Sequence, residues 1–264
     1  MHGFNNLGNT CYFNSAIQVL LHIREISSHI LDNTYEGECT FTKSYEKLVR
    51  LYFSTHETKV FTLGPILVEF VKVFPRFKIG MPHDTQDAIF CLIDILEKGY
   101  PRIKELVYGE TTQITISPVS KNITKIPFCV YILNVKREVK NINTMINESS
   151  KWNVIEDYVD DNGKKHHVAT TRNVFSKYPQ IFIVSFDKKS YVEINEELKI
   201  GDNVYELQST IIHKGIQYGG HYMSTKKLNK DWFIQDDDNL GKLHNFPKED
   251  NHFVLVYNLK TPSC

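Results

Sequence analysis

Cysteine is scarce in this sequence, and the few cysteines are scattered. The 264 residues contain five, at positions 11, 39, 91, 129 and 264. An odd number without paired spacing is not a disulfide framework, and it fits a reducing, intracellular compartment, cytoplasmic or nuclear. No Cys-x-x-Cys pair occurs, so a common arrangement of structural zinc ligands is missing. We expect neither a metal nor another cofactor.

Net charge and long apolar runs are missing as well. The 31 basic and 31 acidic residues balance to a net charge of zero, which gives no reason to expect nucleic acid or a membrane surface as a partner. No apolar run approaches about 18 residues, and the N-terminus carries no signal-peptide pattern. We find no internal repeat. The length suits one large domain or two lobes with an ample core.

The segment Gly3–Ser15 is the most informative part of the chain. It reads Gly-Phe-Asn-Asn-Leu-Gly-Asn-Thr-Cys-Tyr-Phe-Asn-Ser and places Cys11 where a polar loop turns into a helix-period apolar run. Unpaired backbone N–H groups and the helix dipole favour an anion there, so the position predicts a lowered thiol pKa. For an arbitrary cysteine the alternative is a small buried hydrophobe. Two further segments favour a nucleophile.

These segments supply a base and a carboxylate. One is Gly219-Gly220-His221-Tyr222, and a cysteine nucleophile usually takes its proton acceptor from a histidine distant in sequence. With eleven histidines available, His221 alone decides little. The other runs from Trp232 to Asp238 and reads as a strand ending in carboxylates. One of these can bond the second imidazole nitrogen and fix its tautomer; the alternative is an acidic turn.

Together the segments resemble the ubiquitin-specific proteases, a large papain-like family of deubiquitinases. The family's first box reads approximately Gly-Leu-x-Asn-Leu-Gly-Asn-Thr-Cys-Tyr-x-Asn-Ser, and this chain departs from it only at Phe4. The histidine box reads Gly-His-Tyr, then a loop, then Trp-x-x-x-Asp/Asn-Asp. Weaker blocks lie between them in the family's order: Thr85–Ala88, Leu106–Gly109, Tyr178–Ile183 and Val204–Gly215. The resemblance covers essentially the whole chain and implies a minimal catalytic domain.

The expected fold is α+β and papain-like, with thumb, fingers and palm in a single domain, 1–264. The thumb is expected to about residue 106, the fingers over about 107–178 and the palm over about 179–264. The apolar pattern is helical in the first part, alternates around one short helix near 143–150 in the second, and predicts strands in the third. We expect helices at Phe41–Phe53, Leu63–Phe74 and Asp84–Leu96, and strands at Ile181–Phe186, Val204–Ile212, Asp231–Gln235 and His252–Tyr257.

The resemblance also implies roles for individual residues. Cys11 matches the nucleophile and His221 the general base. Asp236 matches the third triad member, and Asp237 matches the polar neighbour that supports it. Asn6 matches the position whose side-chain amide donates to the oxyanion, although a turn residue that bonds its own backbone is the alternative.

Substrate contacts are expected from the tail of ubiquitin, which is basic and ends in two glycines. Gly219, Gly220 and Tyr222 are expected to line a narrow channel for it. Asp87 matches a carboxylate that contacts the tail; the alternative is an ordinary acid in the first turn of a helix.

The implied function is thiol-dependent hydrolysis of (iso)peptide bonds at the C-terminus of ubiquitin, by a monomer whose partners are ubiquitin or ubiquitinated proteins. Thr85 stands where the family has Gln, and Phe90 where Glu is usual. These departures leave open a peptidase for another ubiquitin-like modifier. A catalytically weak ubiquitin-binding member is the non-enzyme alternative, but a binding scaffold has no physical need for all four catalytic positions.

The fingers depart from the family in one more respect. Many members bind a structural zinc there through two Cys-x-x-Cys pairs, whereas the stretches 115–119 and 158–163 contain no cysteine. His166 and His167 are adjacent, so on a strand they would point to opposite faces. We expect them in a solvent-exposed loop, and we expect sheet pairing alone to hold the fingers together.

Overall fold

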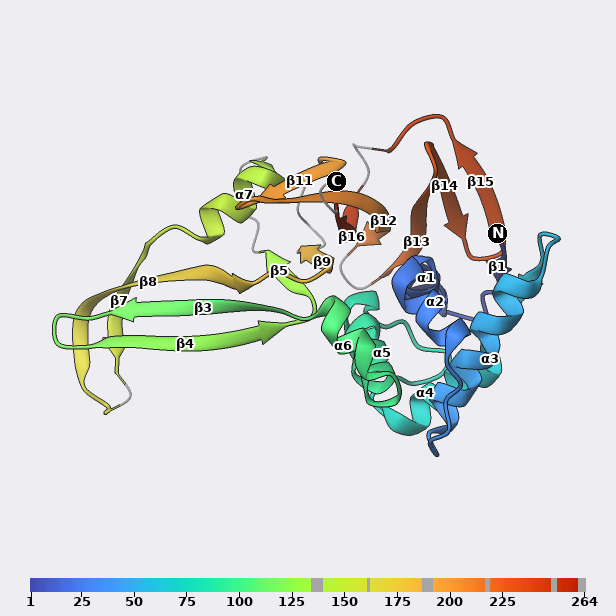
Figure 1. Ribbon diagram of the computed structural model, residues 1–264, viewed down its shortest axis with the longest axis horizontal. Helices are drawn as coiled ribbons and strands as arrows, with labels where there is room; N and C mark the ends of the chain where they lie inside the picture. Colours follow the sequence, from blue (N-terminus) through green and yellow to red (C-terminus); the bar gives the residue numbers. More distant parts are fainter. Residues whose placement is uncertain (134–139, 161, 187–191, 217–218, 248–250, 261–264) are drawn as a thin grey trace.

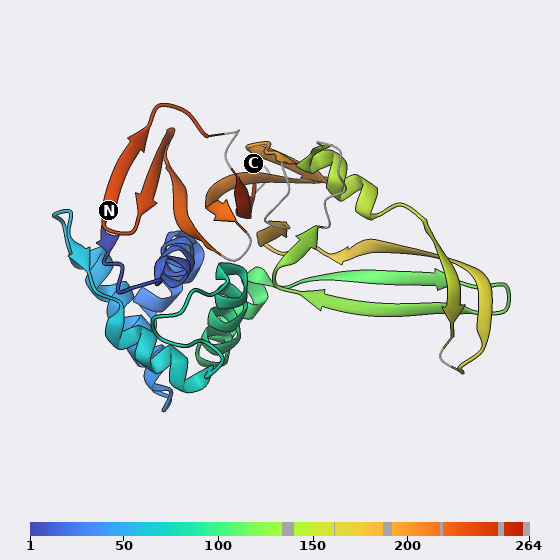
Figure 2. The ribbon, with the colours of Figure 1, turned by 180° about the vertical axis from the view of Figure 1, so that it is seen from behind.

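A computed structural model describes residues 1–133, 140–160, 162–186, 192–216, 219–247 and 251–260. Figures 1 and 2 show three parts: a helical thumb, a long ribbon of fingers that extends away from it, and a palm built of strands. The α+β class predicted from the sequence is confirmed. No helix among the described residues is long and apolar enough to cross a membrane.

The thumb holds six helices among the described residues. Its predicted helices are confirmed within a few residues, and the N-cap of the third is Asp84, which accepts a hydrogen bond from the Gln86 N–H at 2.8 Å. Pro65 lies in a first helical turn, where the missing N–H costs nothing. The elements are β1 (Gly3–Phe4), α1 (Cys11–His22), α2 (Arg24–Asp32), α3 (Thr40–Ser54), β2 (Val60–Phe61), α4 (Gly64–Val73), α5 (Thr85–Gly99) and α6 (Pro101–Val107).

The fingers are a four-stranded antiparallel sheet in the order β4-β3-β8-β7. Their strands are β3 (Gly109–Ile116), β4 (Lys121–Phe128), β7 (Asn153–Val159) and β8 (Lys165–Lys177). The described part of the segment between β4 and β7 was expected in the fingers but packs against the palm. It holds β5 (Tyr131–Leu133), β6 (Lys140–Asn141) and α7 (Ile142–Ser149). Its apolar side chains explain the difference, because Leu133, Met145 and Ile146 pack into the palm core.

The palm is built on an eight-stranded sheet, ordered β15-β14-β13-β12-β16-β9-β5, with β11 paired to β12. The predicted strands are present as β9, β12, β14 and β16. The strand that carries His221, β13, was not predicted, because its glycines and lysines hide the apolar alternation. The strands are β9 (Ile181–Phe186), β10 (Val192–Glu193), β11 (Glu197–Ile200), β12 (Asn203–Ile216), β13 (Gly219–Leu228), β14 (Asp231–Asp236), β15 (Asn239–Leu243) and β16 (His252–Leu259).

Helix α1 is the element that joins thumb and palm. Every residue of it except His22 is buried, and it packs against α5 on one side and against β12 and β13 on the other. One hydrophobic core surrounds α1 and includes residues of β9, β12, β13 and β16, and a second core lies between the palm and α7. Cys11 begins α1, and His221 lies near the start of β13, a palm strand against which α1 packs.

Lys226 of β13 and His22 of α1 make a buried polar contact between thumb and palm. Lys226 is 2% exposed, and its ammonium donates to His22 Nε2. His22 Nδ1 lies 2.5 Å from the backbone oxygen of Gln18, so it carries the ring proton and leaves Nε2 as the acceptor. Burial lowers the pKa of Lys226 to about 7. It also lowers the pKa of His22 well below its usual value.

We expect Lys226 to make the stability of the protein pH-dependent. An unfolded lysine has a pKa of about 10.4, so above about pH 7 the unfolded state binds more protons at this position than the folded state. The free energy of unfolding of the wild type should therefore rise relative to Lys226→Met as the pH increases from about 7 to about 9, measured by urea denaturation.

Lys227→Met is the matched control for this measurement. Burial acts to lower the pKa of Lys227, but its bonds to Glu206 and Glu196 outweigh burial and raise it. Lys227 therefore stays charged in the folded and the unfolded protein below about pH 9. The difference in the free energy of unfolding between the wild type and Lys227→Met should not change from about pH 7 to about pH 9. An equally constant difference for Lys226→Met would show that the buried ammonium does not titrate.

Hydrogen bonds close the two turns at the end of the fingers. The hydroxyls of Ser117 and Ser120 lie 2.7 Å apart in the β3–β4 turn. In the β7–β8 turn, the Asp160 carboxylate accepts the N–H of Lys164 at 2.9 Å and contacts His166 Nε2 at 3.0 Å. The expected loop is wrong for both histidines, because His166 and His167 lie on β8. His166 is buried, whereas His167, on the opposite face, is exposed as expected.

We therefore expect purified protein to contain zinc far below one ion per chain. In each turn, polar side chains already bond partners within the same turn: Ser117 with Ser120, and Asp160 with His166. Neither turn holds a cysteine, which is the ligand on which structural zinc sites of this kind depend. Elemental analysis gives the metal content, and activity should survive incubation with a chelator. Stoichiometric zinc, or loss of activity in chelator, would mean that the fingers use other ligands.

Candidate active site

Cys11 is the first residue of α1, as the sequence predicts. Thr10 is the N-cap residue and makes no side-chain capping bond; its hydroxyl accepts the N–H of Leu7 at 2.9 Å instead, within the preceding loop. That loop passes through two residues with positive φ, Gly8 at 90° and Asn9 at 56°. Cys11 is 7% exposed.

The predicted lowering of the Cys11 pKa is wrong for this structure. Burial raises the pKa of the thiol, and the nearby Asp237 carboxylate raises it further. The backbone N–H groups of Tyr222 and Tyr12 act in the opposite direction but do not outweigh burial. The helix N-terminus is thus not enough to lower the pKa of the Cys11 thiol. Formation of the thiolate therefore depends on a nearby proton acceptor that becomes a cation.

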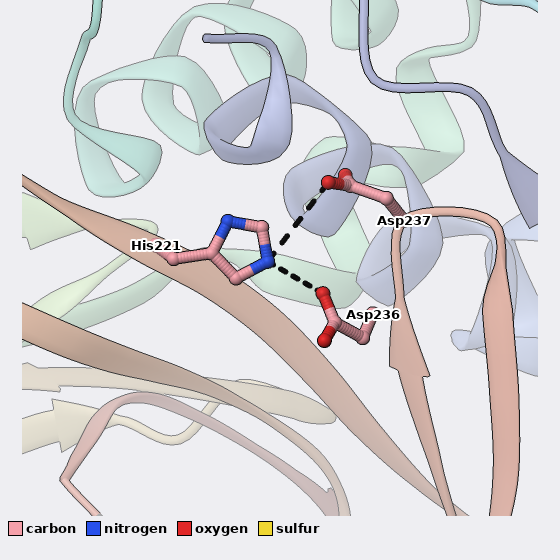
Figure 3. A group of neighbouring side chains, drawn as sticks. All are labelled: His221, Asp236 and Asp237. Atoms are coloured by element: carbon pink, nitrogen blue, oxygen red, sulfur yellow. Dashed lines mark hydrogen bonds and ion pairs between the residues drawn. The ribbon is translucent and has the colours of Figure 1, made fainter.

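His221 has the geometry of that acceptor. Its Nε2 lies 2.5 Å from Asp236 Oδ1, and a carboxylate only accepts, so Nε2 carries the ring proton. Nδ1 is then left unprotonated, and Figure 3 shows it directed away from both carboxylates. No hydrogen bond joins Nδ1 to the Cys11 thiol among the described side chains, and such catalytic bonds often tighten only when substrate binds.

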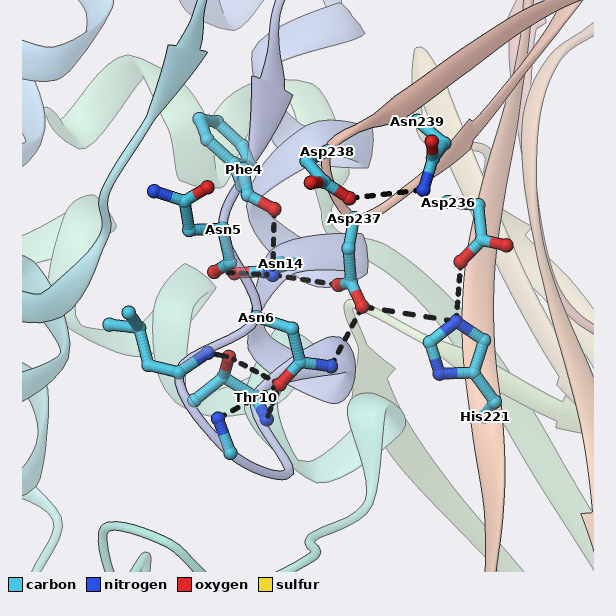
Figure 4. Close-up of polar contacts among 12 residues, drawn as sticks. Phe4, Asn5, Asn6, Thr10, Asn14, His221, Asp236, Asp237, Asp238 and Asn239 are labelled. Atoms are coloured by element: carbon cyan, nitrogen blue, oxygen red, sulfur yellow. Dashed lines mark hydrogen bonds and ion pairs between the residues drawn. The ribbon is translucent and has the colours of Figure 1, made fainter.

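Asp236 and Asp237 differ in their surroundings. The Asp236 side chain is 41% exposed, whereas that of Asp237 is 8% exposed and lies 3.9 Å from His221 Nε2. Asp237 follows the end of β14 with φ of 51°, which turns its carboxylate toward the thumb. Its Oδ2 accepts from Asn6 Nδ2 at 2.7 Å and its Oδ1 from Asn14 Nδ2 at 2.8 Å (Figure 4). Asp237 therefore ties the palm to the segment that carries Cys11.

Both interpretations of Asn6 have support in its contacts. Its Oδ1 accepts the N–H groups of Gly8 and Thr10 at 3.0 and 3.2 Å, as a turn residue would (Figure 4). Its amide nitrogen donates to Asp237. An amide nitrogen carries two hydrogens, so the second one stays available on this exposed side chain. The oxyanion role remains a prediction.

The glycines before His221 bring two backbones close together. Gly220 pairs with Gly215 across β12 and β13, and a Cβ on Gly220 would lie 2.4 Å from His213 Nε2. Both Gly219 and Gly220 are exposed, so their role as channel walls remains a prediction. Tyr222 differs from expectation: its side chain is buried among the core residues. Its backbone N–H bonds the Cys11 thiol.

The start of α5 meets both α1 and the palm. Thr85 donates its hydroxyl to the Tyr12 backbone oxygen at 2.9 Å, which gives the departure from the family's Gln a structural role. Ser185 of β9 donates to the Gln86 side chain. Asp87 is exposed in the first turn of α5, so both of its proposed roles remain open.

His221, Asp236 and Asp237 are also the one group of three or more candidate metal ligands within 4.8 Å of one another in the described part of the chain. Asp237 uses both oxygens to accept amide hydrogens, and His221 Nε2 faces Asp236. The arrangement fits the orientation of an imidazole better than the coordination of an ion. All cysteines among the described residues are free.

Cys11 begins α1, and the His221 imidazole is bonded to the Asp236 carboxylate on the adjoining palm strands. Comparison with known proteins shows the family of the chain. A family model described as "Ubiquitin carboxyl-terminal hydrolase" matches residues 2–257. The chain belongs to the ubiquitin carboxyl-terminal hydrolase family. The family predicted from the motifs is thereby confirmed, since the ubiquitin-specific proteases carry this name.

Curated relatives match part of the chain. The "Probable ubiquitin carboxyl-terminal hydrolase 1" of Schizosaccharomyces pombe is 28% identical over 121 residues, which cover 41% of this chain and 14% of that protein. Human "Ubiquitin carboxyl-terminal hydrolase 15" is 29% identical over 116 residues, 40% of this chain and 12% of that protein. These matches therefore span only a small part of each relative's length.

Solved structures match the whole chain. The Ubp8/Sgf11/Sus1/Sgf73 DUB module of SAGA bound to ubiquitin aldehyde gives a TM-score of 0.84 at 16% identity, covering 100% of this chain and 70% of that one. The same module with a cysteine-to-alanine substitution in Ubp8, bound to monoubiquitin, gives 0.83 at 17% identity with the same coverage. At this identity the likeness concerns the fold, and it supports the predicted papain-like architecture.

Proposed function

We propose that this chain is a cysteine-type deubiquitinase that hydrolyses the (iso)peptide bond at the C-terminus of ubiquitin. The observation that carries the proposal is the arrangement around Asp237. This carboxylate bonds Asn6 and Asn14 of the Cys11 segment and lies 3.9 Å from His221, which is itself bonded to Asp236. These contacts join the segment that carries Cys11 to His221 and Asp236 across thumb and palm, which supports the proposed roles of the three residues.

The first half of the reaction transfers the ubiquitin acyl group to the enzyme. His221 Nδ1 takes the Cys11 proton, and Asp236 stabilises the imidazolium through Nε2. The thiolate then attacks the C-terminal glycine carbonyl of ubiquitin. Negative charge develops on the carbonyl oxygen, where a preorganised donor is typically worth about 3–4 kcal/mol. The second amide hydrogen of Asn6 is our candidate donor.

The second half releases the products. His221 returns its proton to the leaving lysine amine, which leaves a thioester between Cys11 and ubiquitin. The neutral imidazole then accepts a proton from water, and the hydroxide attacks the thioester carbonyl. Cys11 leaves and takes the proton back through His221. The net reaction consumes one water and yields an amine and the free carboxylate of ubiquitin.

The proposed substrate is ubiquitin attached to other proteins. Exposed Gly219 and Gly220 beside His221 leave room for a tail that ends in two glycines, and exposed Asp87 suits its basic residues. A monomer that acts in the cytoplasm or nucleus remains a prediction from the composition.

The experiment that tests this proposal measures kcat/KM on fluorogenic C-terminal substrates of ubiquitin and of several ubiquitin-like modifiers in parallel. We expect hydrolysis of ubiquitin and much weaker hydrolysis of the others. A higher kcat/KM on a different modifier would mean that ubiquitin is not the substrate, while the proposed cysteine-dependent hydrolysis would stand. Absence of hydrolysis with every substrate, by folded protein, would favour a binding role.

A further inference from the structure

Asn14 is a buried polar residue on the helix that carries the nucleophile. It follows Cys11 by three residues, so the two side chains lie on the same side of α1, one turn apart. Asn14 is 2% exposed. Its amide nitrogen lies 2.8 Å from Asp237 Oδ1, 3.2 Å from the Asn5 backbone oxygen and 3.4 Å from that of Phe4 (Figure 4).

Helix packing alone does not explain an asparagine at this position. Asparagine is a weak helix former, and a buried amide costs free energy unless it is bonded. An apolar residue would suit the core better, but it would leave Asp237 Oδ1 without the Asn14 donor. Since the Asp237 side chain is 8% exposed, water replaces that donor poorly.

The two donors on Asp237 act together. One donor on one oxygen leaves a carboxylate free to rotate, whereas donors on both oxygens fix its plane. Asn6 holds Oδ2 and Asn14 holds Oδ1, and the fixed plane keeps Oδ2 3.9 Å from His221 Nε2. Asn6 lies in an exposed loop, while Asn14 lies in a buried helix, so Asn14 is the more rigid of the two.

We propose that Asn14 is a positioning residue for catalysis. It acts through Asp237 and sets the placement of the His221 imidazole relative to the Cys11 thiol across the contact between thumb and palm. Because the reacting thiol and Asn14 lie on the same helix, the bond from Asn14 to Asp237 fixes that helix relative to the palm residues around His221. The inference rests on the proposed function for its kinetic readout.

The test compares Asn14→Ala with Gln18→Ala, a control from the same helix. Gln18 is equally buried, and its amide also donates to a backbone oxygen of the N-terminal segment, that of His2 at 2.8 Å, but it contacts no active-site residue. Both variants should lower the thermal midpoint. Only Asn14→Ala should lower kcat on a ubiquitin fluorogenic substrate, by about tenfold or more, with KM within about twofold.

A double-mutant cycle shows whether Asn14 acts through Asp237. In an Asp237→Ala background, Asn14→Ala should lower kcat by less than about a further twofold, since the shared partner is already gone. If Asn14→Ala does not fold, Asn14→Leu keeps the volume and removes the donor. Equal losses of kcat in the Asn14 and Gln18 variants, or an undiminished loss in the Asp237→Ala background, would overturn the proposal.

A second readout separates this proposal from the substrate assignment. The rate at which iodoacetamide alkylates Cys11, followed by mass spectrometry, reports formation of the thiolate and needs no ubiquitin. It should fall in Asn14→Ala and stay at the wild-type value in Gln18→Ala. If the wild type cleaves no ubiquitin substrate but Asn14→Ala is still alkylated more slowly than the wild type, the proposed function is contradicted and the role of Asn14 is not. An unchanged alkylation rate in Asn14→Ala would overturn that role.

Discussion

Replacement of Cys11 with serine is expected to abolish hydrolysis of ubiquitin conjugates while leaving the fold intact. Serine is close in size, so the tightly packed start of α1 should accept it. Its hydroxyl is far more weakly acidic than a thiol, and burial already opposes ionisation of Cys11. Loss of a nucleophile lowers kcat by several orders of magnitude in other hydrolases. Initial rates on a ubiquitin fluorogenic substrate give the loss, and thermal unfolding gives the control.

The other cysteines provide a comparison within the same chain. Cys39, Cys91 and Cys129 are free, and none of them lies in the group around His221; Cys264 is outside the described residues. Serine variants of these cysteines should keep kcat near the wild-type value. Near-normal activity of Cys11→Ser, or inactivity of one of the others despite normal folding, would place the nucleophile elsewhere.

Replacement of Asp236 with alanine is expected to lower kcat/KM by at least roughly tenfold, since it orients a general base that itself contributes about 10²–10⁴. The carboxylate within hydrogen-bond reach of the imidazole is that of Asp236. Asp237→Ala should match it, because it removes the acceptor of both Asn6 and Asn14. Asp238→Ala should be close to neutral, since that side chain is exposed and, among the described residues, bonds only its neighbour Asn239.

Steady-state kinetics of the three variants on one ubiquitin substrate test this order. Thermal unfolding separates Asp237 from Asp236: loss of the nearly buried Asp237 side chain should lower the midpoint, and loss of the Asp236 side chain, which is 41% exposed, should not. If Asp238→Ala lowers kcat/KM and Asp236→Ala does not, the carboxylate that orients His221 is that of Asp238 rather than that of Asp236.

The sequence predicted those features that depend on local patterns. Helix-period apolar residues located α3, α4 and α5, and apolar runs located β9 and β16. The resemblance to the family's histidine box selected His221 out of eleven histidines, and the distance from Trp232 in that box selected Asp236 out of three consecutive aspartates. The structure brings that pair together. These predictions succeeded because each depends on residues a short distance apart in the chain.

The features that the sequence did not predict depend on contacts between distant segments. The pKa of Cys11 follows from the palm covering α1, and a helix-end argument does not include that burial. Strand β5 and helix α7 pack into the palm because a second core lies there. The role of Asn14 depends on a bond to a residue 223 positions away, although its spacing from Cys11 already placed both on one side of a helix.

The most direct measurement of the central claim is the reaction of the protein with ubiquitin that carries an electrophile at its C-terminus, followed by peptide mapping. We expect one covalent adduct per chain, on Cys11, and none on the His221→Ala variant under the same conditions, because the buried thiol needs the imidazole to ionise. An adduct on another cysteine, or full labelling of Cys11 without His221, would contradict it.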